Sequence, residues 1–499
     1  MEMAGTQSKQ DQKIEHFDVL IVGAGISGID AAYHLQKDCP NKSFVILENQ
    51  ESFGGTWLTH KYPGIRSDSD LYTFGYKWKP WDGAPIATAD RILDYMKEAI
   101  EENDIERHIR FNSNVKSASW SSEEKKWTLY VEDKSSGALK AFTCNFLWMC
   151  QGYYRHSEGY TPEFPGMESF DGEIVHPQTW PEDMVTEGKK IVVIGSGATA
   201  ATLIPALVGK CDHITMLQRS PTYFFPAPNK NDLADELRSL DVKPEWIHEI
   251  TRLKVLKEQE LTAQRSFQDP ESLKKDLLNA AREILGPDFD IEKHFTPSYR
   301  PWRQRLAFIP NGDLFVALRE GKASVVTDHI ETFTEKGILT KSGEELEADI
   351  IVTATGFNLS VMGDIDFSID GGPLDFADRW AHRGIMFSGI PNMAWVFGYL
   401  RTSWTMRANL VSDFVCRLLH HMDEKDVQMV TPELREEDMD MPKLDFVDEE
   451  NFNAGYLMRN MHLMPKQGDK QPWVFSQDYY KEKDEIPAAD LEDGTLVYK

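Results

Sequence analysis

The sequence predicts an α/β protein with two dinucleotide-binding domains, and three observations support this prediction. Two glycine-rich turns, Gly23 to Gly28 and Gly195 to Ala200, each follow a short apolar strand pattern and precede a helical pattern. The stretch from about 225 to 300 is charged, helical in its periodicity and free of nucleotide motifs. Because strand, glycine turn and helix in this order are typical of Rossmann-like folds, we expect two such domains with a helical insert in the second. At 499 residues the chain is also too long for one ordinary core.

Composition and charge exclude several classes of function. The formal net charge of −27 argues against nucleic acid or an anionic membrane surface as a partner, because both attract basic patches. The longest apolar run, 191–208, is interrupted by a glycine turn and is therefore typical of strand, turn and helix, not of a membrane span. The segment Met1 to His16 is polar and lacks the apolar core of a signal peptide. We therefore expect a cytoplasmic protein without integral membrane contact.

The cysteines argue against a metal or dithiol centre. The sequence has five of them, an odd number, and no pair has C-x-x-C spacing. A disulfide framework, a zinc site and a dithiol redox centre are all disfavoured by this pattern. We expect no metal, and a reducing compartment fits. The cysteines are Cys39, Cys144, Cys150, Cys211 and Cys416.

The first glycine turn predicts a site for FAD or NAD. Gly23 permits the tight turn, Gly25 lets the backbone approach a pyrophosphate, and Gly28 lets the following helix pack on the strand. The helix N-terminus supplies amide donors to the phosphates. Glu48 ends the next strand, 20 residues after Gly28, where its carboxylate can accept hydrogen bonds from both ribose hydroxyls. The same negative charge would repel a 2′-phosphate, so NADP does not fit this site.

The second glycine turn predicts a site for NADPH. The strand 190–194 leads into a G-x-G-x-x-A turn and a helix. The next strand, 213–217, ends without an acid and continues into Gln218, Arg219 and Ser220. A cation and a hydroxyl at this position suit a 2′-phosphate, although Arg219 could also be a solvent-exposed arginine at a strand end. The residues expected to contact this cofactor are Gly195, Gly197, Thr199, Ala200, Arg219 and Ser220.

Two dinucleotide sites that differ at the acid position imply FAD together with NADPH, and hydride transfer from one to the other. We expect residues 1–153 to form the first part of the FAD-binding domain. Residues 154–356 would form the NADP-binding domain, with the helical insert at about 225–300. Residues 357–499 would return to the FAD-binding domain.

A motif between the two glycine turns indicates the chemistry. Phe170, Gly172, His176, Trp180 and Pro181 have the spacing F-x-G-x-x-x-H-x-x-x-W-P. This run resembles the fingerprint of Baeyer–Villiger monooxygenases, which are class B flavoprotein monooxygenases. Related enzymes that oxidise nitrogen and sulfur usually carry Tyr or Phe in place of the Trp. The resemblance implies that His176 couples the two domains during the cycle without touching substrate.

The same family resemblance extends to a loop that lines the flavin. Gly55, Trp57 and Asp68 match the pattern G-x-W-x-x-x-x-[FY]-P-G-x-x-x-D, together with the run 62–64. Residue chemistry alone would favour a turn or cap role for Asp68, as for most loop aspartates. The resemblance instead implies that Asp68 lies at the active site and that Gly55 and Trp57 contact FAD.

The exit from the predicted insert carries three arginines within six residues, in the run 300–305. A surface loop paired with carboxylates would explain them equally well from composition. The resemblance implies that Arg305 reaches the flavin and stabilises a negatively charged flavin-peroxide, with Arg303 and Arg66 as alternatives. Many family members have Lys immediately before this arginine, where it helps to bind the 2′-phosphate. Here Gln304 stands in that place, which weakens the expected NADPH preference and leaves Arg219 as its main determinant.

The chain then returns towards the first domain. The run 346–357 reads as a strand followed by a small-residue turn and matches the A-T-G segment that joins the two domains of these flavoproteins, so Thr355 and Gly356 are expected at the cofactors. The run 386–397 is expected to form one strand. The run 404–419 is expected to form a helix whose N-terminus faces the flavin. Trp473 either belongs to a mobile segment of the family or packs in the core.

The resemblance covers nearly the whole chain and is nearest to the ethionamide-activating branch of the family. It implies an NADPH-dependent enzyme that reduces FAD, adds O2 and inserts one oxygen atom beside a ketone carbonyl to give an ester or lactone. Arg305 and Asp68 would be the catalytic pair, and oxidation of sulfide sulfur would be a second activity. A flavin monooxygenase that oxidises only sulfur or nitrogen is the main alternative. A disulfide-reductase-like flavoprotein is disfavoured by the absence of C-x-x-C, and a non-enzymatic NADP-binding protein would consume no oxygen.

Overall fold

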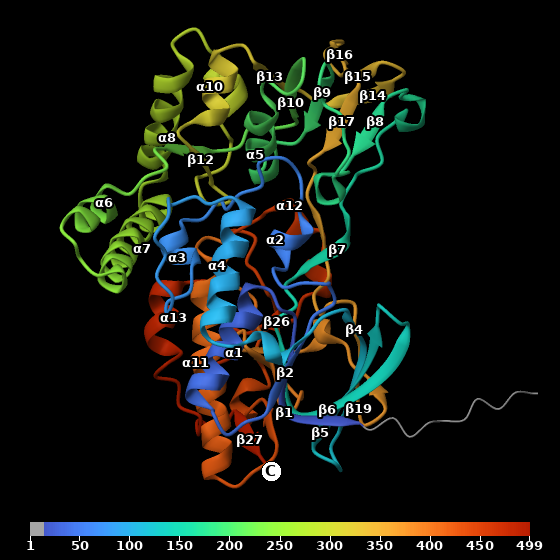
Figure 1. The fold of residues 1–499 in the computed structure, drawn as a ribbon, viewed down its shortest axis with the longest axis vertical. Coiled ribbons are helices and arrows are strands. Elements are labelled where there is room, and N and C mark those ends of the chain that lie inside the picture. The colour runs from blue at the N-terminus through green and yellow to red at the C-terminus, as the bar shows by residue number, and fades with distance from the viewer. Residues whose placement is uncertain (1–13) are drawn as a thin grey trace, which may run out of the picture.

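The computed structural model describes residues 14–499, arranged as two sheets with helices packed around each. Most of the segment Met1 to His16, on which the expectation of no signal peptide rests, lies outside the described residues. Figure 1 shows one sheet in the lower half of the molecule and the other in the upper half, with the chain passing between them more than once. The predicted α/β fold with two Rossmann-like domains is confirmed.

The lower sheet is mixed, with strand order β20-β19-β4-β5-β6-β1-β2-β3 and β23 paired to β6. Its parallel centre, β23, β6, β1 and β2, is almost fully buried, as expected for short runs of β-branched and apolar residues covered on both faces. The strands are β1 (Glu15–Val22), β2 (Phe44–Leu47), β3 (Ile109–Arg110), β4 (Ser113–Ser121), β5 (Lys126–Asp133), β6 (Ala138–Met149), β19 (Asp366–Ile369), β20 (Gly372–Pro373) and β23 (Met393–Trp395).

Helices α1 (Ile26–Asp38), α4 (Ala89–Glu102) and α11 (Trp404–Glu424) share one hydrophobic core with this sheet. Helices α1 and α11 lie against each other, so the helix that follows the first glycine turn is supported by a helix from the far end of the chain. Short elements complete this half of the molecule. They are α2 (Thr56–Thr59), α3 (Leu71–Phe74), α12 (Gly455–Met458), α13 (Tyr479–Glu485), β24 (Val430–Pro432), β25 (Leu444–Asp445), β26 (Lys466–Gln467) and β27 (Leu496–Tyr498).

The upper sheet is entirely parallel, with strand order β13-β10-β9-β17-β8. Helices α5 (Ala198–Leu207) and α10 (Asp313–Arg319) pack on it, and the antiparallel strands β14, β15 and β16 form a separate small sheet beside it. The strands are β8 (Glu173–Val175), β9 (Lys190–Ile194), β10 (His213–Gln218), β13 (Ala323–Thr327), β14 (Ile330–Thr334), β15 (Gly337–Thr340), β16 (Glu345–Glu347) and β17 (Ile350–Thr353).

The helical insert is divided between the two halves of the molecule. Helix α8 (Pro270–Leu285) packs against α10 of the upper half, and α9 (Ile291–Phe295) joins the same core. Helices α6 (Asp232–Ser239) and α7 (Pro244–Gln268) pack instead on the lower half, where α7 contacts α3. Figure 1 shows α6 and α7 at the edge of the molecule and α8 near α10. Strands β11 (Phe224–Ala227) and β12 (Ala307–Pro310) pair where the insert leaves and re-enters.

Two connecting strands, β7 (Tyr154–Gly159) and β18 (Phe357–Leu359), pair antiparallel between the two sheets. Strand β7 begins at the predicted boundary 153/154, and β18 begins at the predicted boundary 356/357. At these two boundaries the predicted NADP-binding segment meets the two predicted FAD-binding segments. That division stays a prediction.

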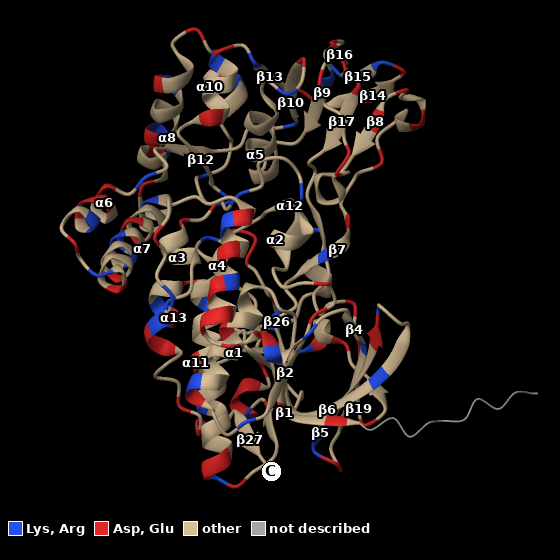
Figure 2. Cartoon of the chain, in the orientation of Figure 1, with Lys and Arg blue, Asp and Glu red and all other residues tan. Residues whose placement is uncertain are grey.

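Most expected strands and helices appear within two residues of their predicted bounds, but one expectation is wrong. The run 386–397 does not form a single strand; it forms β22 (Met386–Phe387) and β23, separated by a turn at 388–392. The break falls at Gly389, Pro391 and Asn392, which are typical turn residues, although most of the turn is buried. Figure 2 shows acidic residues on helices of both halves, mixed with basic ones. Among residues 14–499, no helix combines the length and apolarity needed to cross a bilayer.

Candidate active site

A cavity of about 1050 Å³ lies between the two sheets. Most predicted site residues line it, although they come from segments far apart in the sequence. Those that line the cavity are Gly23, Gly25, Glu48, Gly55, Trp57, Asp68, Gly195, Gly197, Thr199, Arg219, Ser220, Gln304, Arg305, Thr355 and Gly356. Those that do not are Gly28, Ala200, Phe170, Gly172, His176, Trp180 and Pro181.

The first glycine turn has the geometry that a dinucleotide needs. Helix α1 begins after Gly25 with no side-chain cap and no acid in its first turn, so its amide donors are free to bind a phosphate. A Cβ on Gly28 would lie 1.9 Å from the carbonyl oxygen of Gly23, so only glycine lets the helix pack this closely on the strand. Gly25 faces Gly55 of the flavin loop, where a Cβ on Gly25 would come within 3.7 Å of the Gly55 Cα.

Glu48 stands at the end of β2, buried except for 5% of its surface. Its carboxylate accepts hydrogen bonds from the amides of Ala24, at 2.6 Å, and Gln50, at 2.8 Å. A carboxylate can accept about four hydrogen bonds, so acceptor capacity remains for two ribose hydroxyls. Burial raises the pKa of Glu48 despite these bonds, which favours a partner that donates to it. The cradle of glycines and the acid therefore fit an adenine dinucleotide without a 2′-phosphate.

The second glycine turn has the same construction. Helix α5 begins after Gly197, again without a side-chain cap or an early acid. Gly195 adopts φ +125°, and a Cβ there would lie 2.3 Å from the carbonyl oxygen of Ala354. A Cβ on Gly197 would meet nothing within 4 Å, so the space beside it is open to a ligand. The methyl group of Ala200 is fully buried in the core of this half, which explains why Ala can replace the third glycine.

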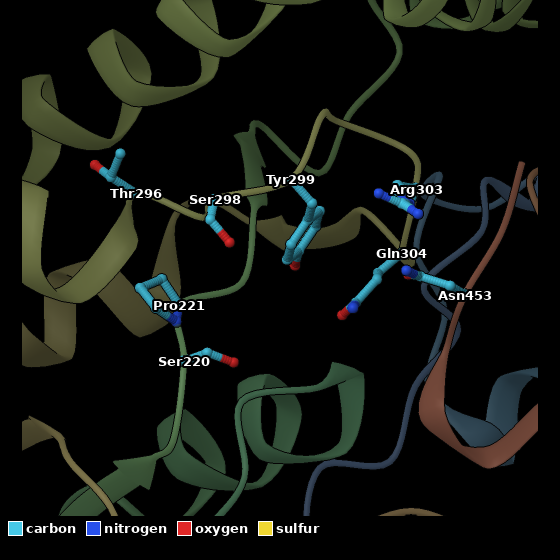
Figure 3. Close-up of a pocket in the computed structure, with 8 residues that line it drawn as sticks. All are labelled: Ser220, Pro221, Thr296, Ser298, Tyr299, Arg303, Gln304 and Asn453. Carbon is cyan, nitrogen blue, oxygen red and sulfur yellow. The ribbon is translucent and has the colours of Figure 1, made fainter. Parts of the chain in front are cut away.

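A side pocket of about 420 Å³ opens beside the end of β10. Ser220 forms part of one wall, and Tyr299 and Gln304 point towards it from the exit of the insert, as Figure 3 shows. Arg219, next to Ser220, is exposed. Within residues 14–499 it has no ion-pair partner, since no carboxylate approaches its guanidinium closely enough. An exposed arginine beside a polar pocket is consistent with a 2′-phosphate site.

Arg305 and Asp68 form a two-pronged ion pair on the cavity wall. Arg305 donates from Nε to Asp68 at 2.7 Å and from Nη2 at 2.8 Å, and also to the Ser69 hydroxyl at 2.8 Å. Its Nη1 donates to the carbonyl of Leu400 at 2.9 Å. Because a guanidinium has five N–H donors, one donor on Nη1 remains without a protein partner among the described residues.

The ion pair fixes both charges. Burial opposes the charged form of each group, but attraction to Arg305 outweighs it and lowers the pKa of Asp68. Asp68 in turn outweighs the effect of burial on Arg305 and raises the pKa of that guanidinium. Each side chain is 28% exposed, towards the cavity. The site therefore presents a permanent positive charge, held in one orientation, to a ligand in the cavity.

The two alternative arginines are held elsewhere. Arg66 pairs with Asp313 at 2.5 Å, across the boundary between the two halves, and Arg303 pairs with Glu450 at 3.0 Å. Neither lines the large cavity. Of the three arginines considered from the sequence, only Arg305 lines the large cavity, whereas Arg303 lines the side pocket.

His176 of the fingerprint holds the two connecting strands together. Its Nε2 lies 3.0 Å from the carbonyl of Gly356, at the start of β18, and its Nδ1 accepts from the amide of Gln178 at 3.1 Å. A Cβ on Gly159, at the end of β7, would lie 1.9 Å from the imidazole. These contacts require the neutral ring with the proton on Nε2, and burial lowers the pKa of His176 accordingly.

The other fingerprint residues pack at the edge of the upper half. Gly172 is needed because a Cβ would lie 2.3 Å from the carbonyl oxygen of Asp349. Phe170 packs against Phe333 with ring centroids 6.4 Å apart, and Trp180 joins the core of the upper half. The carbonyl of Pro181 accepts from Met184. These contacts give the fingerprint residues a place in the fold, and their assignment to function stays a prediction.

The cavity residues that the sequence did not indicate include three tyrosines and one arginine. Tyr153 and Tyr154 follow β6, and Tyr456 lies in α12. The hydroxyl of Tyr153 lies 2.8 Å from that of Tyr154 and 3.3 Å from that of Tyr456. Arg459 stacks over Tyr160 at 3.6 Å and has no carboxylate partner among the described residues. The two tyrosines at the carboxyl end of a parallel strand could have been suspected, because ligands bind at that edge.

The role of Trp473 and the absence of a metal site are the two remaining expectations from the sequence. Trp473 is fully buried, and its Nε1 donates to Asp438 at 3.1 Å, so it packs in the core and does not face the cavity. In the part of the chain that the structure describes, no group of His, Cys, Asp and Glu has the arrangement of a metal site. The five cysteines are free thiols.

The chain matches known families over both glycine turns. Residues 21–78 match the NAD(P)-binding Rossmann-like domain, and residues 82–229 match the family described as flavin-binding monooxygenase-like. The FAD-containing monooxygenase EthA of Mycolicibacterium smegmatis is 48% identical over 468 residues, 93% of this chain and 94% of that protein. The protein of the same name from Mycobacterium tuberculosis is 46% identical over 491 residues, 97% of this chain and 98% of that protein.

Among solved structures, an oxidised steroid monooxygenase bound to NADP has the same fold, with a TM-score of 0.75. Its identity is 21%, and the match covers 97% of this chain and 99% of that one. Two dinucleotide-binding turns that open on one cavity define a flavoprotein oxidoreductase of the two-domain class. The chain belongs to the family of FAD-containing monooxygenases. The family resemblance inferred from the sequence motifs is thereby confirmed.

Proposed function

We propose that this enzyme is an NADPH-dependent Baeyer–Villiger monooxygenase that inserts one oxygen atom of O2 next to a ketone carbonyl. The observation that carries the proposal is the Arg305–Asp68 pair, which lines the same cavity as the first dinucleotide turn and keeps one N–H donor without a partner among the described residues. The Trp at position 180 of the fingerprint, which resembles that of ketone-oxidising enzymes, supports the same choice.

FAD, when bound, supplies the oxygen chemistry, with electrons that come from NADPH. The residues of the first turn, with Glu48, Gly55 and Trp57, would hold FAD. The residues of the second turn, with Arg219, Ser220 and Gln304, would hold NADPH. Thr355 and Gly356 line the space between the two turns. His176 would transmit movement between the halves through its bond to Gly356.

Arg305 would stabilise negative charge that develops on oxygen during transfer, as donors in an oxyanion hole do. Asp68 would keep the guanidinium in place. Its negative charge would also reduce the net charge of the pair, so that the site attracts an anion without binding it too tightly. The three tyrosyl hydroxyls close to this pair give the substrate oxygen a set of hydrogen-bond donors. Cofactors bound in the cavity between the two halves would limit water there, which favours oxygen transfer over release of hydrogen peroxide.

Oxidation of sulfide sulfur is the second proposed activity. Burial raises the pKa of Tyr153, Tyr154 and Tyr456, so their hydroxyls stay protonated and would donate hydrogen bonds to oxygen during its transfer to sulfur. A ketone or a sulfide and O2 are therefore the proposed small-molecule partners.

Product analysis tests the proposal. The FAD-loaded protein would be supplied with NADPH, air, a linear ketone, a cyclic ketone and an aryl methyl sulfide, and the products identified by mass spectrometry. An ester or lactone from either ketone supports ketone oxygenation. Sulfoxide without any ester would assign the enzyme to the class that oxidises heteroatoms only.

A further inference from the structure

Two arginines near the cavity share one aromatic ring. The guanidinium of Arg300 lies 4.1 Å from the centre of the Phe267 ring, and that of Arg401 lies 5.1 Å from it. Phe267 is near the end of α7 and is 48% exposed. The stack therefore lies at the surface, where α7 of the insert contacts the segment that follows Leu400.

Neither arginine has an acidic ion-pair partner in the part of the chain that the structure describes. Arg300 donates only to main-chain carbonyls, those of Pro301, Glu450 and Asn451. Arg401 has no hydrogen-bond acceptor or ion-pair partner among residues 14–499, and the nearest acid that influences it is Asp478, beyond ion-pair distance. Burial, and then repulsion from a neighbouring arginine, lower the pKa of each guanidinium.

Arginines without acidic partners are unexpected in a protein of net charge −27, which has 81 acidic residues available to neutralise cations. Cation–π contact with an exposed ring stabilises a guanidinium only modestly. Partly buried guanidinium donors without acceptors, such as those of Arg401, are normally avoided next to a like charge. A pair of this kind is satisfied when an external anion bridges the two forks.

The stack lies on the same two segments that position Arg305. Arg300 precedes Arg305 by five residues, and Arg401 follows Leu400, whose carbonyl accepts from Arg305 at 2.9 Å. Summed bond lengths place the Arg401 and Arg305 guanidinium groups at most about 14 Å apart. Leu400 and Thr402, on either side of Arg401, line the large cavity. An elongated molecule that leaves the cavity beside Leu400 and Thr402 would need to extend no further than this to meet the stack.

We propose that Arg300 and Arg401 bind the carboxylate of an elongated anionic substrate whose carbonyl or sulfur lies at Arg305. This inference rests on the proposed function and extends it to a substrate class, an aliphatic chain with an acid at one end. The carboxylate stays at the surface, where little desolvation is required, while the apolar chain enters the cavity. Such a substrate would otherwise be repelled by the acidic surface.

A matched pair of substrates tests the proposal. One is a straight-chain keto acid with about eight methylenes between its carboxylate and its carbonyl, enough to span the distance above. The other is its methyl ester, which has the same carbonyl without the charge. For the wild-type enzyme we expect the KM of the acid to be lower by about tenfold or more, the size of a charged hydrogen-bond pair. Equal KM values for acid and ester would overturn the proposal.

The variants Arg401→Gln and Arg300→Gln should raise the KM of the keto acid about tenfold and leave that of the ester unchanged. Arg401→Lys, which keeps the charge, should lose only part of the effect. Arg265→Gln is the matched control, because Arg265 lies on α7 close to the stack but is paired with Asp276 at 2.7 Å. A control variant that affects the acid as strongly as Arg401→Gln would contradict a specific site.

A binding measurement separates this inference from the reaction. Calorimetric titration of the FAD-loaded wild type and Arg401→Gln with a saturated fatty acid of the same length needs no turnover. Loss of binding in the variant, with an unchanged melting temperature, supports the carboxylate site even if no ketone is oxygenated. Undiminished binding in the variant overturns the site, even if ketones are oxygenated.

Discussion

The imidazole of His176 donates to the carbonyl of Gly356, 3.0 Å away, and so joins the fingerprint to the segment where the chain leaves the upper sheet. Its other nitrogen is already occupied by the amide of Gln178. Because Gly159 has no Cβ, the ring also lies directly against β7. One side chain thereby touches both strands that connect the halves, which gives a physical basis to the role that the family resemblance implies.

Replacement of His176 should leave FAD binding intact and impair the coupling between the two halves of the molecule. We expect His176→Ala to bind FAD normally but to slow flavin reduction by NADPH at least tenfold, because a buried carbonyl loses its donor and the connecting strands lose their common contact. Stopped-flow absorbance measures the reduction rate. His213→Ala is the control, since His213 is also partly buried and bonds only to Ser324 within the upper sheet. Equal effects of the two substitutions would argue against a coupling role.

Arg305→Ala should leave the reduction of FAD by NADPH largely intact and should lower product formation about 10²- to 10³-fold, the usual cost of a lost oxyanion donor. NADPH oxidation would then continue as release of hydrogen peroxide. Product and peroxide are quantified in the same reaction. Asp68→Ala should have the same direction of effect, because Arg305 loses both ends of its carboxylate support. Arg265→Ala, which removes an arginine of α7 paired with Asp276, is the control. Full product yield from Arg305→Ala would remove Arg305 from the proposed role.

Arg219→Ala tests cofactor preference. The exposed Arg219 lies next to Ser220 at the end of β10, beside a polar side pocket. We expect the KM for NADPH to rise about tenfold and that for NADH to change little, since only NADPH has the 2′-phosphate. Gln304→Lys should act in the opposite direction by adding a cation on the opposite wall of the pocket. If Arg219→Ala raises both constants equally, the 2′-phosphate is held elsewhere.

Substitution by alanine should have different effects at Gly197 of the second turn and at Gly28 of the first turn. Gly197 has φ −77° and nothing within 4 Å of an added Cβ, so Gly197→Ala should fold with an unchanged melting temperature. Its methyl group would occupy the space left for the pyrophosphate, and we expect the Kd for NADPH to rise about tenfold or more. Gly28→Ala should instead destabilise the fold itself, because its Cβ meets a carbonyl at 1.9 Å. Thermal unfolding and NADPH titration of both variants distinguish these outcomes. A large loss of stability in Gly197→Ala would mean that its space belongs to the protein.

The parts of the site that follow from local sequence were predictable. A glycine turn, its strand and its helix lie within one stretch of chain, and Glu48 follows at a fixed distance, so their spacing alone indicates the first site. The pairing of Arg305 with Asp68 joins residues 237 positions apart. No periodicity reports such a contact, and here only resemblance to a family indicated it.

Other features of the site and the fold could not be predicted from the sequence, for physical reasons. Tyr456 and Arg459 belong to a short helix and its end, where too few residues exist for a periodic pattern. The insert was expected in one domain, but α7 packs on the lower half because Arg252 donates to the carbonyls of Tyr72, Thr73 and Gly75. Contacts of this type depend on tertiary placement, which charge and periodicity do not encode.

The buried histidines predict that acid weakens the fold. His60 is 4% exposed, and burial lowers its pKa from an ordinary 6.5 to about 4. The unfolded chain therefore binds a proton more readily than the folded chain as the pH falls below 6.5. The contribution to the free energy of unfolding is fully present above pH 6.5 and is lost as the pH falls through 4. For His60 it amounts to about 3 kcal/mol.

Urea unfolding at pH 7.5 and at pH 4.5 measures this effect. We expect the midpoint to fall in acid for the wild type and to fall less for His60→Gln, which cannot take up the proton. His156 and His176 act in the same direction, because burial lowers the pKa of each and both lie close enough to His60 to repel its protonated form. His329→Gln, at an exposed position, should retain the full dependence of the wild type. An identical decrease in wild type and His60→Gln would show that the loss in acid arises from other groups.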